Sequence, residues 1–185
     1  KAYCNIEFGN IHANPVYYAN NLYLNGELIE DLVIPEGVSK ISDALFYRLD
    51  HIKSVTIPNS VTSIAYRAFE GCSGLTSVVW NVVNYSDFSN SSNTPFYNSR
   101  ANITSFTFGD SVEHIPAYLC YGLSKLTSIE IPNSVTSIAY RAFEGCSGLT
   151  SVTIGNSVTS IAESTFTSCS GLTNVYINDL KAYCN

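Results

Sequence analysis

Apolar and polar residues alternate in short stretches that return along the chain at a fixed interval. In residues 151–154 the valine and isoleucine fall on one face and the serine and threonine on the other, and this period of two predicts a half-buried β-strand. Such stretches end at Pro58, Pro132 and Gly155, and proline cannot extend a strand ladder because it has no backbone N–H. Short strands with fixed stops are therefore the first element that the sequence predicts.

These strands return at a regular 23-residue interval. The segment 58–78 recurs letter for letter at 132–152. Five of the six steps between inward strand positions are equal, and only the step from Val78 to Phe106 is longer, by five. A unit this short cannot bury its own apolar residues, so we expect the units to stack and to pair their strands in parallel. The seven inward positions are Leu32, Val55, Val78, Phe106, Ile129, Val152 and Val175.

Each unit has a second apolar pattern after its long strand. Residues 135–138 form a second short β-like step, and Ala142, Phe143, Cys146 and Leu149 follow at i, i+1, i+4 and i+7. This spacing indicates one or two helical turns that point inward. The sequence predicts an α/β-type solenoid of about seven repeats, a right-handed coil with a parallel β-sheet on one side and short helices or 3-10 turns on the opposite side.

Two blocks of the unit carry a family resemblance. Ile-Pro-Asn-Ser-Val-Thr-Ser-Ile stands at 57–64 and 131–138, and Ala-Phe-x-x-Cys-Ser-x-Leu stands at 68–75 and 142–149. Over residues 22–177 the chain resembles the BspA-type leucine-rich repeats found in surface proteins of host-associated bacteria and some protozoa. The resemblance implies a curved right-handed solenoid with a cell-surface role in adhesion or recognition.

The repeat pattern divides the chain into three parts. Residues 1–30 form a cap or junction, with a short helix at 14–19 and a hairpin at 22–29 turned by Asn25 and Gly26. Residues 31–177 form the solenoid, with the expanded repeat at 78–103. Residues 178–185 begin a C-terminal helix. Lys-Ala-Tyr-Cys-Asn opens the chain at 1–5 and returns at 181–185, either because the piece is one module of a tandem array or because both ends belong to a common terminal helix.

Composition narrows the possible partners. Only 13% of the 185 residues are charged, the formal net charge is −6 and the pI is about 4.9, so nucleic acid and anionic membranes are unfavourable partners. No apolar stretch reaches the roughly 18 residues of a transmembrane helix. The chain begins at Lys1 and contains no Met, so we expect a processed or excised piece. An extracellular or cell-surface location follows from the resemblance alone.

The cysteines and histidines are not spaced as catalysis or metal binding would require. Three of the six cysteines, Cys72, Cys146 and Cys169, occupy one repeat position, which predicts a buried thiol column with no disulfides. No pair has the spacing of a zinc or redox site. His12, His51 and His114 lie in different repeats, and we expect the coils to keep them apart from carboxylates and nucleophiles. The sequence therefore predicts no enzyme, no metal site and no cofactor.

Two surfaces remain as candidates for binding. The outward columns of the long strands offer Thr107, Glu130, Thr153 and Tyr176, although serine and threonine at such positions also stabilise a sheet without any ligand. The expanded repeat offers a second set of exposed side chains, because Trp80 and Phe96 align with inward residues and are assigned to the core. This second set is Tyr85, Phe88, Tyr97 and Arg100.

These surfaces support two hypotheses. The first is a recognition or adhesion module that binds a protein or a carbohydrate. The alternative is a structural spacer, joined to further modules by head-to-tail self-association, and the repeated Lys-Ala-Tyr-Cys-Asn favours it.

Overall fold

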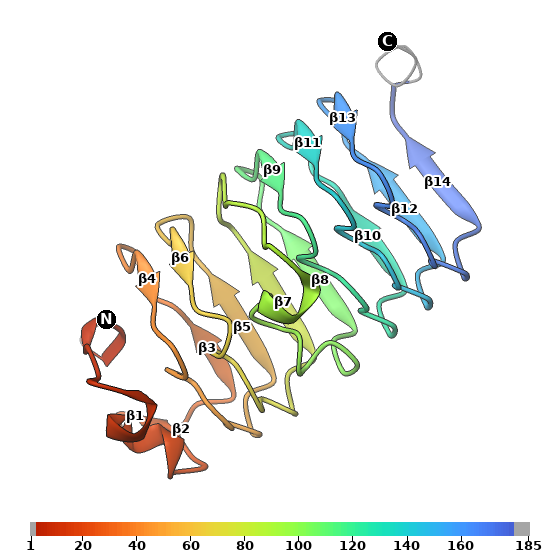
Figure 1. Ribbon diagram of the computed structural model, residues 1–185. Coiled ribbons are helices and arrows are strands. Elements are labelled where there is room, and N and C mark those ends of the chain that lie inside the picture. Colours follow the sequence, from red (N-terminus) through yellow and green to blue (C-terminus); the bar gives the residue numbers. More distant parts are fainter. Residues whose placement is uncertain (1–2, 180–185) are drawn as a thin grey trace.

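The computed structural model describes residues 3–179 as a stack of β-coils (Figure 1). Parallel pairing joins the long strands into a four-stranded sheet, β3-β5-β7-β8, and a three-stranded sheet, β10-β12-β14. Val55 pairs with Val78, Val78 with Phe106 and Val152 with Val175, so the predicted register, with its one longer step, is confirmed. The strands are β3 (Asp31–Val33), β5 (Ser54–Ile57), β7 (Ser77–Trp80), β8 (Ser105–Phe108), β10 (Ser128–Glu130), β12 (Ser151–Ile154) and β14 (Asn174–Ile177).

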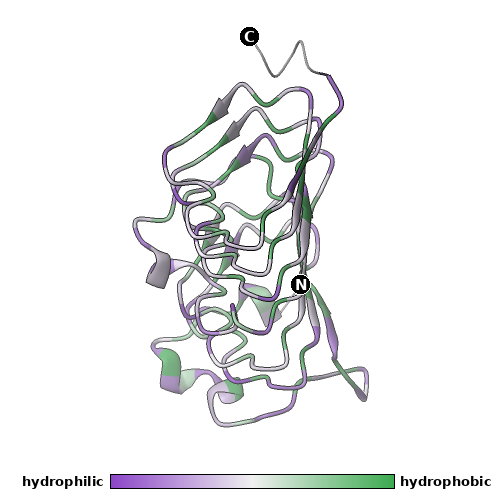
Figure 2. Ribbon diagram, turned by 90° about the vertical axis from the view of Figure 1, so that its right-hand side faces the viewer, coloured by the Kyte–Doolittle hydropathy of each residue, from purple (hydrophilic) through white to green (hydrophobic). Residues whose placement is uncertain are grey.

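The inward residues of successive coils form continuous apolar columns. Figure 2 shows the stacked coils with hydrophobic and hydrophilic segments alternating along the chain. Phe46 stacks on Phe69 with ring centroids 5.5 Å apart, and Phe69 stacks on Phe96 at 5.7 Å. Trp80 and Phe96 are buried, as predicted. Each buried aromatic contributes about 1.5–3 kcal/mol of transfer free energy, so the stacking of coils accounts for the core.

A second, shorter set of strands runs along another side of the coils. β4 (Lys40–Ile41) pairs with β6 (Ser63–Ile64), and β9 (His114–Ile115), β11 (Ser137–Ile138) and β13 (Ser160–Ile161) form a separate parallel sheet. The expanded repeat lies between these two groups. There the chain forms a single bridge between Asn84 and His114, and Val83 O accepts the N–H of Glu113 at 2.8 Å.

The turn side of each coil differs from the sequence expectation. The described residues contain no α-helix, and the segment around Ala142 and Phe143 is a series of turns. Arg141 and Gly145 have φ of 56° and 77°, which interrupts a helix. The freed N–H groups bond to the next coil instead, as Phe143 N does to Thr165 O at 3.0 Å. The i, i+4 spacing thus marks side chains that point inward, but the backbone N–H groups of this segment form hydrogen bonds to the next coil and not within a helix.

The cysteines form the predicted thiol column. The five described cysteines are free. Cys72 Sγ donates to Phe46 O at 3.0 Å and Cys146 Sγ donates to Cys120 O at 3.1 Å. Burial raises the pKa of the Cys72 thiol to about 12. The thiols of Cys72 and Cys146 therefore each satisfy a buried carbonyl of a preceding coil.

The N-terminal segment packs on the first coil. It contains the 3-10 helices η1 (Tyr3–Asn5), η2 (Ile11–Ala13) and η3 (Pro15–Tyr17), and the antiparallel hairpin of β1 (Tyr23–Leu24) and β2 (Glu27–Leu28). Asn14 caps η3 and is completely buried, with Nδ2 donating to Ala44 O at 2.8 Å. A buried amide bonded in this way fixes the segment against the solenoid.

Two further segments complete the description. Asn25 and Gly26 have φ of 54° and 87°, as the predicted Asn-Gly hairpin turn requires. The 3-10 helix η4 (Ser91–Asn93) lies in the expanded repeat, capped by Asn90. The predicted C-terminal helix lies outside the described residues from position 180 onward. No helix of residues 3–179 is long and apolar enough to cross a membrane.

Candidate ligand-binding surfaces

The long sheet carries a row of predicted binding residues across its exposed face. Glu130 is in register with Thr153, and Thr153 with Tyr176. Thr107 occupies the corresponding outward position of β8, between the buried Phe106 and Phe108. Residues at matching positions of stacked parallel strands point to the same side of the sheet. The structure therefore places on one face Thr107, Glu130, Thr153 and Tyr176.

This face is interrupted between β8 and β10. Each of the other neighbouring long strands is joined by a ladder, whereas β8 and β10 belong to separate sheets. Phe106 and Phe108 stand in β8 where β12 has Val152 and Ile154, and Phe108 packs edge-to-face on Phe143 with centroids 6.3 Å apart. The larger rings coincide with the break in the ladder.

A hollow of about 360 Å³ lies at this break. Its walls come from β8, β10 and the residues after each strand, and they include Thr107, Asp110, Ser128 and Glu130. Neither Asp110 nor Glu130 pairs with a basic side chain among residues 3–179. Two unpaired carboxylates beside hydroxyl groups make a site that attracts a cationic side chain. Thr107 and Glu130 were predicted as binding residues from the sequence, whereas Asp110 was not.

Two of the aromatic residues predicted to be exposed are in the core. Tyr85 is 9% exposed and Phe88 is 8% exposed. Tyr85 Oη accepts the N–H of Ile64 at 2.7 Å, and its ring stacks on Phe88 with centroids 5.2 Å apart. The interpretation of these two residues as ligand contacts is therefore wrong. They fill the space between β6 and β9, where the expanded repeat supplies no short strand.

Tyr97 and Arg100 remain at the surface, but away from the long sheet. The Arg100 guanidinium lies over the Tyr97 ring at 3.8 Å from its centroid and donates to Tyr97 O. Their segment packs through Phe96 against Phe106 from across the core, with centroids 6.1 Å apart. The eight predicted residues thus do not form one site.

His114 contacts both a carboxylate and a hydroxyl, contrary to the sequence expectation. Its Nε2 lies 2.9 Å from Asp87 Oδ1 and its Nδ1 lies 2.7 Å from Ser137 Oγ. Asp87 Oδ1 also accepts the N–H of Ala117 at 2.8 Å. These contacts tie the expanded repeat to β9 and β11. Ser137 occupies the repeat position equivalent to His114 in the next coil, a signal that the sequence contained.

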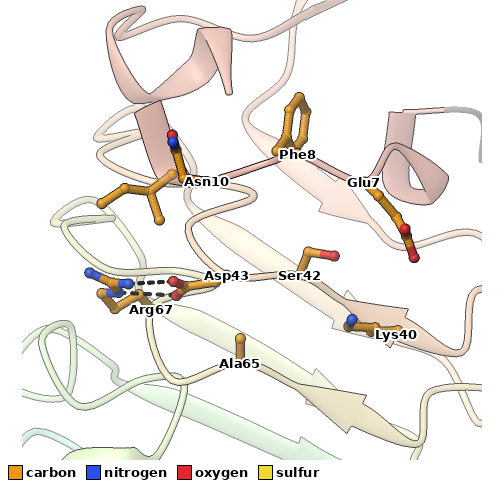
Figure 3. A pocket seen from close by; sticks show the side chains of 9 residues that line it. Glu7, Phe8, Asn10, Lys40, Ser42, Asp43, Ala65 and Arg67 are labelled. Carbon is orange, nitrogen blue, oxygen red and sulfur yellow. Dashed lines mark hydrogen bonds and ion pairs between the residues drawn. The ribbon is translucent and has the colours of Figure 1, made fainter. Parts of the chain in front are cut away.

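A larger cleft of about 600 Å³ lies where the N-terminal segment meets the first two coils (Figure 3). Figure 3 shows Glu7 and Phe8 on one side and Ser42 and Asp43 on the other, with the Phe8 ring directed away from Ser42 and Asp43. The repeat pattern does not predict this cleft, because the cleft joins a segment outside the repeat to turns within it. No group of three His, Cys, Asp or Glu side chains among residues 3–179 could hold a metal ion.

The coils, the parallel sheets and the regular register define a leucine-rich-repeat solenoid. The family model described as "BspA type Leucine rich repeat region (6 copies)" matches residues 16–95 and 89–184, and the chain belongs to this family. A comparison with curated proteins found no match.

Among solved structures, the first two bacterial proteins below share the fold. A leucine-rich repeat protein from Bacteroides ovatus has 26% identity and a TM-score of 0.65 over 80% of this chain, which spans 37% of that protein. A leucine-rich repeat protein of T. pallidum has 23% identity and a TM-score of 0.62, covering 80% of this chain and 71% of the other. A leucine-rich cell surface protein from Faecalibacterium prausnitzii has 19% identity and a TM-score of 0.44, covering 84% and 62%.

Proposed function

We propose that the chain is a non-enzymatic recognition module, displayed outside the cell, that binds a protein through the exposed face of its long sheet. The observation that carries the proposal is the hollow between β8 and β10, with Asp110 and Glu130 unpaired beside Thr107. A lysine or arginine of the partner would enter the hollow. Membership of the BspA-type family supports display at the cell surface.

The rest of the face would make shallower contacts around this anchor. Thr153 and Tyr176 continue the row beyond Glu130, and Tyr176 is exposed. Tyrosine at an interface supplies a large contact area with a hydroxyl at its rim. The partner would therefore lie across β10, β12 and β14, with its cationic side chain at one end of the contact.

The test is binding to an array of extracellular-matrix proteins and to peptides that carry one Lys or Arg in a neutral background. The isosteric variant Asp110→Asn/Glu130→Gln should weaken binding about tenfold or more, because it removes both charges without changing shape. Glu36→Gln/Glu163→Gln removes the same charge from exposed positions outside the hollow and should leave binding unchanged. Equal affinities for the two variants would exclude the hollow as the anchor.

A second candidate function is a spacer that stacks end to end with further modules. It rests on the last described coil, where Val175 and Ile161 are 53% and 41% exposed although their equivalents Val152 and Ile138 are 1% exposed. Light scattering over a concentration series tests it. Association that Val175→Thr/Ile161→Thr abolishes, and that the exposed Tyr66→Ser leaves intact, would favour the spacer; a concentration-independent mass would exclude it.

A further inference from the structure

The ladder between β8 and β10 is already lost where the two strands begin. In a regular coil, the carbonyl that precedes the long strand accepts hydrogen bonds from the next coil. Thr76 O accepts the N–H groups of Thr104 at 2.9 Å and Ser105 at 3.1 Å, together with the Thr104 hydroxyl at 3.3 Å. Thr104 O is the equivalent carbonyl before β8, and within residues 3–179 it accepts no such bond from the coil of β10. The seam between these strands therefore leaves backbone acceptors free.

A second carbonyl lacks a donor where the strands end. Gly109 N donates to Trp80 O at 2.9 Å, so Gly109 directs its N–H toward β7. Successive residues of a strand direct their backbone groups to opposite sides, and the C=O of Phe108 therefore points toward β10. The residue equivalent to Gly109 in the coil of β10 is Pro132, which has no N–H. Phe108 O thus receives no bond from β10, and both Phe108 and Pro132 line the hollow.

The two carboxylates lie at this same end of the hollow. Asp110 stands two residues after the end of β8, and Glu130 is the last residue of β10. Both are exposed, and neither pairs with a basic side chain within residues 3–179. The free carbonyl of Phe108 is an acceptor of independent origin, because it results from the proline in the facing strand. Acceptors therefore outnumber donors at this end of the seam.

An arginine side chain matches such a set of acceptors better than a lysine side chain does. The guanidinium is planar and carries five N–H donors in a fixed fork, so one edge can bond a carboxylate while another N–H bonds a carbonyl. The lysine ammonium is a compact point charge that is more strongly hydrated. It is attracted by the same carboxylates, but it loses more hydration when it enters the hollow.

We propose that the hollow selects arginine over lysine, with the guanidinium of a partner protein bonded at once to a carboxylate of Asp110 or Glu130 and to Phe108 O. This inference rests on the proposed function, since it specifies which cationic side chain enters the same hollow. The volume of about 360 Å³ admits either side chain, so the selection arises from the directions of the donors and not from size.

The experiment uses four peptides of one neutral background that differ at a single residue. The residue is arginine, lysine, asymmetrically dimethylated arginine or citrulline, and binding to the whole chain is measured by calorimetry. Dimethylation keeps the charge and blocks the fork, whereas citrulline removes the charge. We expect the arginine peptide to bind about tenfold more tightly than the lysine and dimethylarginine peptides, and the citrulline peptide to bind most weakly of the four.

Nuclear magnetic resonance locates the arginine. The carbonyl carbon of Phe108 is observed through the amide of Gly109, and its resonance should shift when the arginine peptide saturates the protein. The carbonyl carbon of Trp80, observed through the amide of Asn81, is the internal reference, because Trp80 O is already bonded to Gly109 N. We expect the Trp80 resonance to stay in place.

A pair of proline variants tests the role of the free carbonyl. Pro132→Ala supplies a backbone N–H that competes for Phe108 O and should lower the ratio of arginine to lysine affinity about threefold. Pro58→Ala makes the same change at the equivalent position of an earlier coil and should leave the ratio unchanged. If Pro132→Ala lowers the urea midpoint, Pro132→Gly replaces it, since glycine stands at the equivalent position 155.

The outcomes separate this inference from the proposed function. Absence of binding by every cationic peptide would contradict the proposed function itself. Equal affinities for the arginine, lysine and dimethylarginine peptides would leave the proposed function standing and overturn the selection of arginine. A Phe108 carbonyl resonance that stays in place at saturation, or an affinity ratio that Pro132→Ala leaves unchanged, would exclude Phe108 O as the acceptor and overturn the inference.

Discussion

At the residue scale, one hydroxyl closes the gap that the expanded repeat leaves in the short sheet. The N–H of Ile64 has no carbonyl of an adjacent strand to bond to, and it donates to Tyr85 Oη at 2.7 Å. Tyr85→Phe leaves this buried N–H unsatisfied and should lower the free energy of unfolding by about 1–3 kcal/mol. Urea unfolding measures the change. Tyr97→Phe removes a hydroxyl that has no hydrogen-bond partner in residues 3–179 and should have little effect; equal losses would contradict the assignment.

The buried thiol and phenol groups should make the fold less stable as the pH rises above about 9. Burial raises the pKa of Cys72 from 9.0 to about 12, and burial also raises the pKa of Tyr3 to about 12. A raised pKa in the folded state stabilises the fold below the unfolded pKa, and this contribution is lost as pH rises through the folded value. We expect the urea midpoint to fall between about pH 9 and pH 12, with a shallower slope in Cys72→Ala. A constant midpoint would contradict the burial of these groups.

The direction of a side chain, inward or outward, could be predicted from the sequence only where the residue follows the regular repeat spacing. Glu130 and Tyr176 follow the regular repeat spacing, so their outward direction could be predicted from Thr153. Tyr85 and Phe88 lie in the longer step of the repeat, and alternation cannot fix which side chains turn inward there. Phe8 belongs to a segment without repeats, so no repeat position indicated its neighbours.

At the element scale, the coils require close approach of backbones at particular glycines. A Cβ on Gly148 would lie 2.3 Å from Ser124 O of the preceding coil. Gly148→Ala should therefore lower the free energy of unfolding by about 1–3 kcal/mol, as overpacking does. Gly9→Ala, where a Cβ would meet nothing within 4 Å, is the matched control. Equal urea midpoints for the two variants would show that the coils can separate without cost.

The elements themselves were partly predictable. The strands follow from alternation and from the stops at Pro58 and Gly155, and the structure places them accordingly. The turns did not follow, because an inward pattern at i, i+4 is shared by a helix and by stacked turns. The positive φ of Arg141 and its bond to the next coil decide between them, and an arginine side chain does not by itself favour that conformation.

At the scale of the whole molecule, the hydrogen-bonded ladders of the solenoid break at or next to the expanded repeat, although the ladder between β7 and β8 continues across it. The long sheet breaks between β8 and β10, and the short sheet breaks between β6 and β9. On the turn side, bonds join Phe46 to Ala68 and Cys120 to Ala142, whereas within residues 3–179 none of this type joins the expanded repeat to a neighbouring coil. On that side, the stacking of Phe69 on Phe96 and side-chain hydrogen bonds, such as that of Ser99 Oγ to Cys72 O at 2.9 Å, span the interruption.

Because a solenoid is stabilised by terms between neighbouring coils, this interruption should divide it into two cooperative units. Native-state hydrogen exchange measures the opening free energy of each amide. We expect the amides of β10, β12 and β14 to open together at a lower free energy than those of β5 and β7, since Val175 is exposed and, within residues 3–179, β14 pairs with β12 only. Restoring the ladder between β8 and β10 should merge the units. The variant Phe106→Val/Phe108→Ile gives β8 the inward side chains of β12 and should therefore bring the two opening free energies closer together. A single opening energy for all protected amides of the wild type would show that aromatic packing across the expanded repeat couples the coils as strongly as the ladders do.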